Sequence, residues 1–119
     1  MFEGCTGLSS VPTGLLPALD ASYDCYRYMF KGCTALLNTP ELPATTVRGQ
    51  CYQEMFYNCH SLTAGPTVLP ATELTNNCYR SMFQLCNSLV NAPILSATDS
   101  AEYSCDCMFA DCSSLTALP

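Results

Sequence analysis

Apolar positions recur along this chain in a fixed order, as whole blocks of residues and not as single side chains. The pair Met-Phe occurs five times, with its Met at positions 1, 29, 55, 82 and 108. Each of these Met residues is followed by a Cys after four residues, a Leu after seven and a Pro after eleven. Five copies of one pattern predict a repeat protein in which every unit adds one layer to a shared core.

A second block precedes each later Met-Phe pair. It reads LPAL, LPAT, LPAT and LSAT, beginning at residues 16, 42, 69 and 95. Nine residues after the start of each block come Cys25, Cys51, Cys78 and, in the last copy, Ser104. All variation in repeat length lies between the repeat Pro and the next block. This confinement predicts a surface loop there, because a buried segment cannot absorb insertions without shifting its neighbours.

Two kinds of secondary structure are expected within each repeat. In residues 51–59, C-Y-x-x-M-F-x-x-C, the pairs Cys51–Met55 and Tyr52–Phe56 have the i, i+4 spacing of one apolar helix face. Residues 36–42 are too few for a helix and contain a Pro, so they are expected to form a brief strand. The outward face of the short helix is expected to carry Gln53, Glu54, Tyr57 and Asn58.

Together these elements predict the fold class. We expect an α/β repeat solenoid that is leucine-rich-repeat-like, with short parallel strands on one face and short helices on the other. Residues 1–119 are expected to form a single array of about four and a half repeats, which start at residues 1, 29, 55, 82 and 108. The last copy stops partway, so the array is expected to be an excerpt of a longer solenoid.

Composition and charge exclude several classes of function. A length of 119 residues is enough for one domain, and 49% apolar with 12% charged residues is not the composition of a disordered chain. The net charge of −6 argues against nucleic acid and anionic membrane surfaces as partners, since both reward clustered positive charge. No apolar run approaches the roughly 18 residues of a membrane-spanning helix, so no membrane insertion is expected.

The core M-F-x-x-C-x-x-L, repeated at steps of 26 to 28 residues, resembles the BspA-like leucine-rich repeats of bacterial surface proteins. It also resembles the related surface-protein repeat of about 26 residues. The resemblance implies a secreted or surface-attached protein that binds host proteins, other cells or glycans. An extracellular or cell-surface location is therefore expected, although the N-terminal residues MFEGCTGLSS lack the features of a signal peptide.

The ten cysteines allow several interpretations. They recur at inward positions, as expected for small buried thiols. Alternatively, they form one disulfide in each repeat or bridges between adjacent repeats, and the sequence does not choose between these. The within-repeat scheme pairs Cys25 with Cys33, Cys51 with Cys59 and Cys78 with Cys86. In the irregular last copy, Cys107 is expected to be the most exposed cysteine unless it pairs with Cys105 or Cys112.

The sequence gives little support for metal binding, catalysis or nucleotide binding. Cys105, Cys107 and Cys112 offer three thiolates for zinc, but the chain has no C-x-x-C pair. Adjacent residues such as Cys59 and His60 rarely point at each other, so a catalytic pair is not expected there. Nucleotide-binding and calcium-binding motifs are absent from the sequence. We therefore expect no enzyme activity, no cofactor and no metal.

The leading functional hypothesis is a binding module that meets a protein or glycan over several repeats. Side chains on the strand side change from copy to copy while the scaffold is constant, and amphipathic tyrosines stand on the helix side. The candidate binding residues are Asn38, Glu41, Thr67 and Asn91 on the strand side and Tyr28 and Tyr57 on the helix side. The alternative is a structural spacer that self-associates end to end through uncapped repeats.

Overall fold

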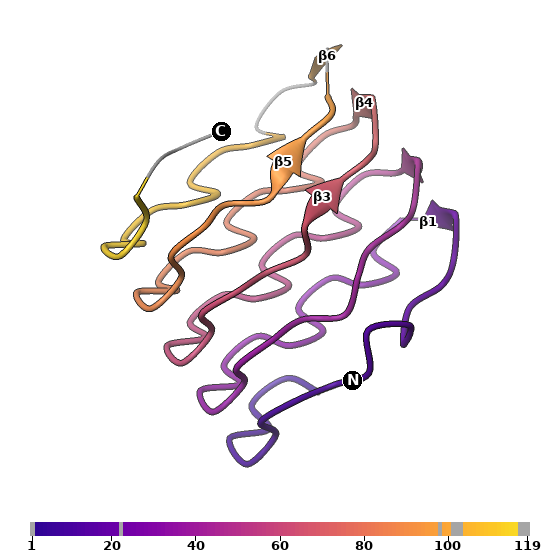
Figure 1. Ribbon diagram of the computed structural model, residues 1–119. Coiled ribbons are helices and arrows are strands. Elements are labelled where there is room, and N and C mark those ends of the chain that lie inside the picture. Colours follow the sequence, from indigo (N-terminus) through magenta and orange to yellow (C-terminus); the bar gives the residue numbers. More distant parts are fainter. Residues whose placement is uncertain (1, 22, 98, 101–103, 117–119) are drawn as a thin grey trace.

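A computed structural model describes residues 2–21, 23–97, 99–100 and 104–116. The chain winds around itself in successive layers that lie side by side, within extents of 33 × 28 × 19 Å (Figure 1). We call each layer a winding. Met1, the expected start of the first repeat, lies outside the described residues.

The strands are only two residues long, and each pairs in parallel with a strand of the neighbouring winding. β1 (Asp20–Ala21) pairs with β2 (Thr46–Val47), and β3 (Val68–Leu69) pairs with β5 (Ile94–Leu95). β4 (Glu73–Leu74) pairs with β6 (Asp99–Ser100), and an isolated bridge joins Ala64 to Asn91. The segments on the side of β3 and β5, residues 37–47, 63–74 and 90–97, form what we call the strand side.

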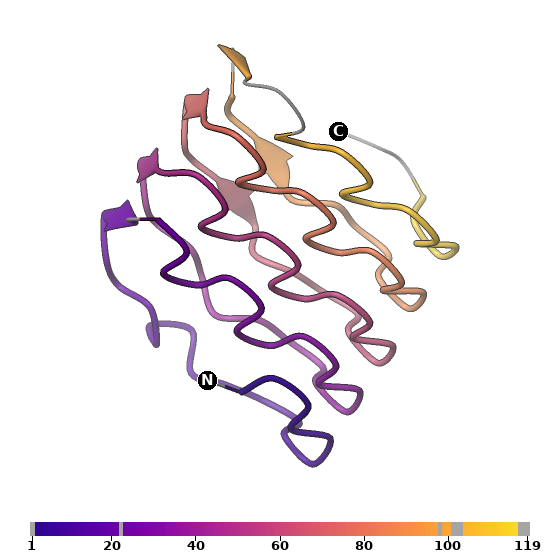
Figure 2. The same ribbon diagram turned by 180° about the vertical axis from the view of Figure 1, so that it is seen from behind.

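The opposite side consists of residues 24–33, 50–59, 77–86 and 104–112, which run as chains of tight turns (Figure 2). We call it the turn side. Backbone N–H groups there alternate between two kinds of partner. Met55 N donates to Tyr52 O within its own winding at 3.1 Å, whereas Tyr52 N donates to Cys78 O of the next winding at 3.0 Å. Phe56 N likewise donates to Met82 O at 2.9 Å. The alternation satisfies the backbone without a helix or a regular sheet.

Left-handed backbone recurs on the turn side at every fourth residue. Gln50, Glu54 and Asn58 have φ values of 62°, 52° and 64°. Glu54 is the third residue of the turn that Met55 N closes onto Tyr52 O, and a positive φ at that position is what a type II turn requires. The turn side therefore repeats with a period of four residues.

The expected α/β, leucine-rich-repeat-like solenoid is wrong. Among the described residues there is no helix, and the strands are isolated two-residue pairs. Each i, i+4 pair of residues 51–59 spans one four-residue turn, so both side chains point inward without helical backbone. The expected strand at residues 36–42 is also wrong, because the strand that follows them in that winding, β2, lies at Thr46–Val47, outside this range.

The core consists of columns of equivalent side chains from neighbouring windings. The ring of Phe56 stacks on those of Phe30 and Phe83, with centroids 5.5 and 5.4 Å apart. The ring of Tyr52 stacks on that of Tyr79 at 5.9 Å. Such offset stacking adds to the free energy of burying the rings. Gln53, expected on the outward face, is only 8% exposed, so that expectation is wrong for this residue.

The cysteines form no disulfide, so the expected bridges are wrong. Two four-residue turns separate Cys51 from Cys59, which places the members of each within-repeat pair in different columns. The closest approach that the structure records is between adjacent windings, where Cys25 Sγ and Cys51 Sγ are 3.9 Å apart, far beyond an S–S bond of about 2.05 Å. The buried thiols are Cys33, Cys51, Cys59, Cys78, Cys86 and Cys112.

Candidate functional site

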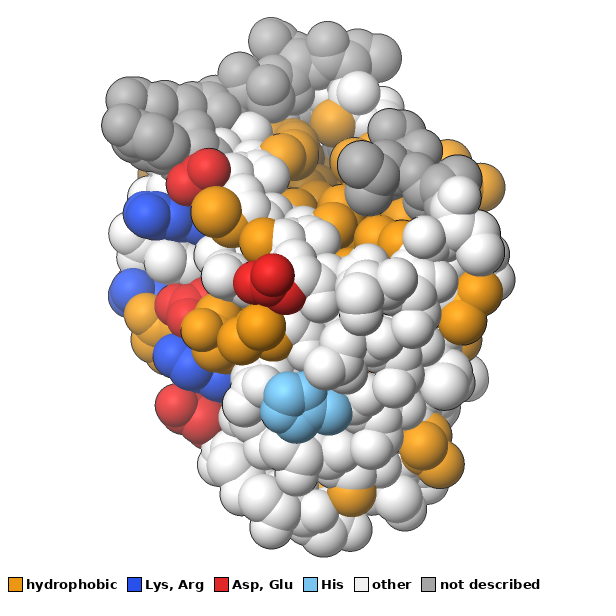
Figure 3. Space-filling model, turned by 90° about the vertical axis from the view of Figure 1, so that its left-hand side faces the viewer, with side chains coloured by type: hydrophobic (Ala, Val, Ile, Leu, Met, Phe, Trp, Pro, Cys, Tyr) orange, Lys and Arg blue, Asp and Glu red, His pale blue; other side chains and the backbone are white. Residues whose placement is uncertain are grey.

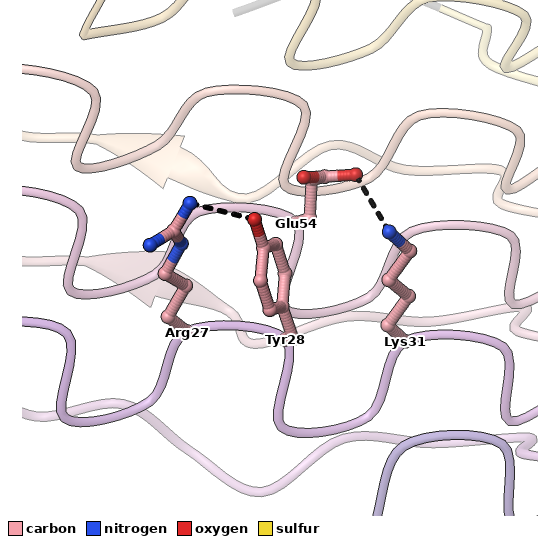
Figure 4. A network of polar contacts seen from close by, with 4 residues as sticks. All are labelled: Arg27, Tyr28, Lys31 and Glu54. Carbon is pink, nitrogen blue, oxygen red and sulfur yellow. Dashed lines mark hydrogen bonds and ion pairs between the residues drawn. The ribbon is translucent and has the colours of Figure 1, made fainter.

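The turn side carries a cluster of charged and aromatic side chains, which we call the turn-side cluster: Arg27, Tyr28, Lys31, Glu54 and Tyr57. Figure 4 shows the first four of them. Lys31 Nζ lies 4.8 Å from the centroid of the Tyr28 ring and 5.1 Å from that of Tyr57, and it bonds Glu54 Oε1 at 3.1 Å. Arg27 donates from Nη2 to the Tyr28 hydroxyl at 2.6 Å. One lysine thus links both tyrosines singled out from the sequence.

Backbone hydrogen bonds between windings hold this cluster in place. Tyr28 N donates to Gln53 O at 3.0 Å, and Gly32 N donates to Tyr57 O at 2.8 Å. Tyr28 also occupies a left-handed position, with φ of 61°, which is unfavourable for a bulky side chain. The equivalent positions in the other windings hold Glu54, Ser81 and Cys107, which also have positive φ. The left-handed backbone at this position therefore belongs to the fold and does not depend on the side chain.

Each of the two basic side chains of the turn-side cluster lies close to an acidic side chain. Partial burial lowers the pKa of Lys31, but the hydrogen bond and charge of Glu54 outweigh it, so that the pKa is raised above its ordinary value. Arg27 Nη1 lies 3.8 Å from Asp24 Oδ1. The other two basic side chains, Arg48 and Arg80, lie 3.8 and 3.7 Å from Asp20 and Asp106. In Figure 3 the charged side chains gather along the left of the view, where the turn side lies.

Two polar atoms beside the cluster have no hydrogen bond within the part of the chain that the structure describes. They are Arg27 Nε and Gln53 Oε1, and both are buried. An unmade hydrogen bond at a buried polar atom costs about 1–3 kcal/mol. Neither atom is open to solvent, so each adds a local cost to the fold beside the cluster.

The four strand-side candidates lie on the other side of the molecule from the tyrosines. Glu41 Oε2 accepts hydrogen bonds from the backbone N and the Oγ1 of Thr67, both at 3.3 Å. Asn38 is half-buried and donates to Val11 O at 3.3 Å, whereas Asn91 is exposed beside Ala64 of the neighbouring winding. The structure thus joins the candidates into two separate groups and not into one site.

Cys59 and the adjacent His60 do not form a pair, and several buried thiols have a raised pKa. Cys59 Sγ is buried and donates to Phe30 O at 3.2 Å, while the adjacent His60 is exposed at the surface in Figure 3. Burial raises the pKa of Cys33 to about 11 and that of Cys78 to about 12, which disfavours the reactive thiolate.

The described part of the last copy does not bring its three cysteines into one group. Cys112 is buried and bonds Phe83 O at 3.0 Å, while Cys105 and Cys107 are exposed. No group of three or more His, Cys, Asp or Glu able to hold a metal occurs in the described ranges. Cys107 is exposed as expected, in common with Cys5, Cys25 and Cys105. The described residues contain no helix long and apolar enough to cross a membrane.

Lys31 was not among the candidate binding residues, although it contacts both candidate tyrosines. Its position is equivalent to that of Tyr57 one repeat later, 26 residues along the chain. Aligning the repeats in columns would have placed it beside Tyr57. No family model, curated protein or solved structure matches this chain.

Proposed function

We propose that this chain is a binding module and not an enzyme, and that it meets a protein or a glycan across several windings. The observation that carries the proposal is the turn-side cluster, in which Lys31 lies over the rings of Tyr28 and Tyr57 from two neighbouring windings. An extracellular or cell-surface location, implied by the resemblance of the repeat motif, belongs to the same proposal.

Of the two partner classes, the composition of the cluster favours a protein. Tyrosine and arginine are enriched among the residues that dominate the binding energy of protein interfaces. Ion pairs and ring contacts already hold Arg27 and Lys31, so fewer rotamers are lost when a partner binds.

The test uses the labelled whole chain on an array of immobilised proteins and on an array of glycans. Each ligand that binds is then measured in solution against the wild type and the variants Tyr28→Ala and Tyr57→Ala. We expect each variant to weaken protein binding by about tenfold or more, the effect of losing about 1.4 kcal/mol of binding energy.

The matched control is Asn91→Ala, an exposed polar side chain on the strand side. It is expected to change the affinity less than about twofold. Binding that depends on Asn91 and not on the tyrosines would move the site to the strand side. Growth of the chain into long particles, with no ligand on either array, would favour the structural spacer.

A further inference from the structure

Two adjoining hollows lie at the corner of the molecule where β1, β2 and β4 follow one another along the right-hand edge of Figure 1. The larger has a volume of about 360 Å³ and the smaller about 300 Å³, and Thr75 lines both. Each volume lies at the lower end of the range for small-ligand sites. This corner is separate from the turn-side cluster and from the four strand-side candidates.

The larger hollow is lined mainly by groups that both donate and accept hydrogen bonds. Its lining includes Thr45, Thr46, Thr72 and Thr75, and a threonine hydroxyl both donates and accepts hydrogen bonds. Thr75 Oγ1 is oriented by its hydrogen bond to Val47 O at 3.3 Å, which leaves its lone pairs available. Arg48 and Glu73 complete the polar lining with one donor group and one acceptor group.

The smaller hollow adds an aromatic face. The Tyr23 side chain is 70% exposed, the largest exposed fraction among the bulky apolar side chains of the described residues. Its ring lies against Gly49, where an added Cβ would come within 3.3 Å of both Cδ1 and Cε1. Gly49 therefore leaves room for the Tyr23 ring, and Asn76 lines the same hollow.

We propose that this corner is a subsite for a neutral saccharide. Sugar rings combine hydroxyls, which donate and accept, with an apolar C–H face that packs on an aromatic ring. The proposal rests on the binding function above in that it names a ligand class for the same module, at a different surface.

Charge and polarity make other ligand classes poorer fits. Arg48 Nε lies 3.8 Å from Asp20 Oδ1, and Glu73 adds a further negative charge, so a phosphate or sulfate would meet no net positive field. A lipid chain would leave the threonine hydroxyls without partners. A neutral polyhydroxylated ligand satisfies both constraints.

The experiment titrates ¹⁵N-labelled whole chain with the neutral trisaccharides maltotriose, cellotriose, mannotriose and galactotriose. At least one sugar is expected to shift the amide resonances of Gly49 and Thr75 with a Kd of about 1 mM or tighter. Tyr23→Ala is expected to weaken this binding by about tenfold. Thr72→Val, which removes a hydroxyl at constant shape, is expected to weaken it by about fivefold, the effect of one net hydrogen bond.

The control His60→Ala, at an exposed position that lines neither hollow, is expected to leave sugar binding unchanged. Absence of shifts at Gly49 and Thr75 with all four sugars would overturn the saccharide inference, and so would shifts that Tyr23→Ala and Thr72→Val leave unaltered. Neither result would touch the proposed function, which is tested by protein binding and its loss in the turn-side variants.

Discussion

The thiol sulfur of Cys86 lies 3.0 Å from the carbonyl oxygen of Phe56, one winding away. The same oxygen accepts the turn-closing bond from Cys59 N at 3.3 Å, so the thiol occupies its second acceptor position. Cys59 and Cys112 repeat this contact in their own windings, at 3.2 and 3.0 Å. The recurring Cys is therefore a small buried side chain that also bonds one winding to the next.

Replacing the Cys86 thiol should lower the stability of the stacked windings. Cys86→Ala removes both the sulfur volume and the contact to Phe56 O at a site that is 0% exposed. We expect the free energy of unfolding, measured by urea denaturation, to fall by about 1–2 kcal/mol. The matched variant Cys107→Ala alters an exposed cysteine, and its effect should stay within about 0.5 kcal/mol. Equal losses of unfolding free energy in the two variants would contradict the claim that Cys86 belongs to a buried column of thiols.

Stability should depend on pH in the alkaline range because of the buried thiols. Burial raises the pKa of Cys33 from 9.0 to about 11. Between these values the unfolded chain has released a proton that the folded chain keeps. The free energy of unfolding therefore falls as pH rises across this interval, and the contribution is complete below pH 9.

The measurement for this dependence is a series of urea titrations between pH 8 and pH 11. In Cys33→Ala the unfolding free energy should fall less steeply with pH. The slope should differ from that of the wild type by up to about 1.36 kcal/mol per pH unit, the value for one proton released on unfolding. A slope identical to that of the wild type would show that Cys33 is not protected by burial.

The left-handed turn positions can be tested with glycine. Ser81 has φ of 53°, a conformation that a side chain disfavours and glycine accepts. Ser81→Gly should therefore raise the free energy of unfolding by up to about 1 kcal/mol. Ser88 follows the left-handed Leu85 by three residues and has no positive φ, so Ser88→Gly should lower stability by about 0.5–1 kcal/mol. Thermal or urea unfolding of both variants gives the comparison.

A substitution in the turn-side cluster should change the stability of the protein much less than a substitution in the buried core. Lys31→Met keeps the apolar stem and removes the charge that bonds Glu54, and partly exposed ion pairs of this kind contribute no more than about 1 kcal/mol. Phe56→Ala, in the buried ring column, should cost about 3–5 kcal/mol. A large loss of stability in Lys31→Met would assign Lys31 to the scaffold and not to the binding surface.

The inward residues could be predicted from the sequence, but the backbone that carries them could not. Cys51, Met55, Tyr52 and Phe56 are all buried, as their spacing indicated. A helix and a row of four-residue turns both bring residues i and i+4 to one face, which made the helix prediction wrong. The discriminating signal is that Cys51, Met55 and Cys59 keep a strict period of four, whereas 3.6 residues per turn would drift by about 40° at each step.

The positions of the strands and the geometry of the turn-side cluster could not be predicted from the sequence, because both depend on contacts between windings. Two-residue strands such as β2 carry almost no signal of their own, because their pairing follows from the stacking of whole windings. Tyr28 and Tyr57 could be picked out as amphipathic residues, but their connection through Lys31 requires the register of one repeat on the next. The column of buried thiols was one of the alternatives that the sequence left open.

The most direct test of the stacked windings and their thiol core is intact mass after alkylation without reduction. In the native protein, Cys5, Cys25, Cys105 and Cys107 are exposed and should react first, while the six buried thiols are protected. After unfolding, all ten cysteines should be alkylated. Fewer than ten alkylated cysteines in the unfolded chain would mean disulfides, and immediate reaction of all ten in the native protein would mean that the core described above does not form.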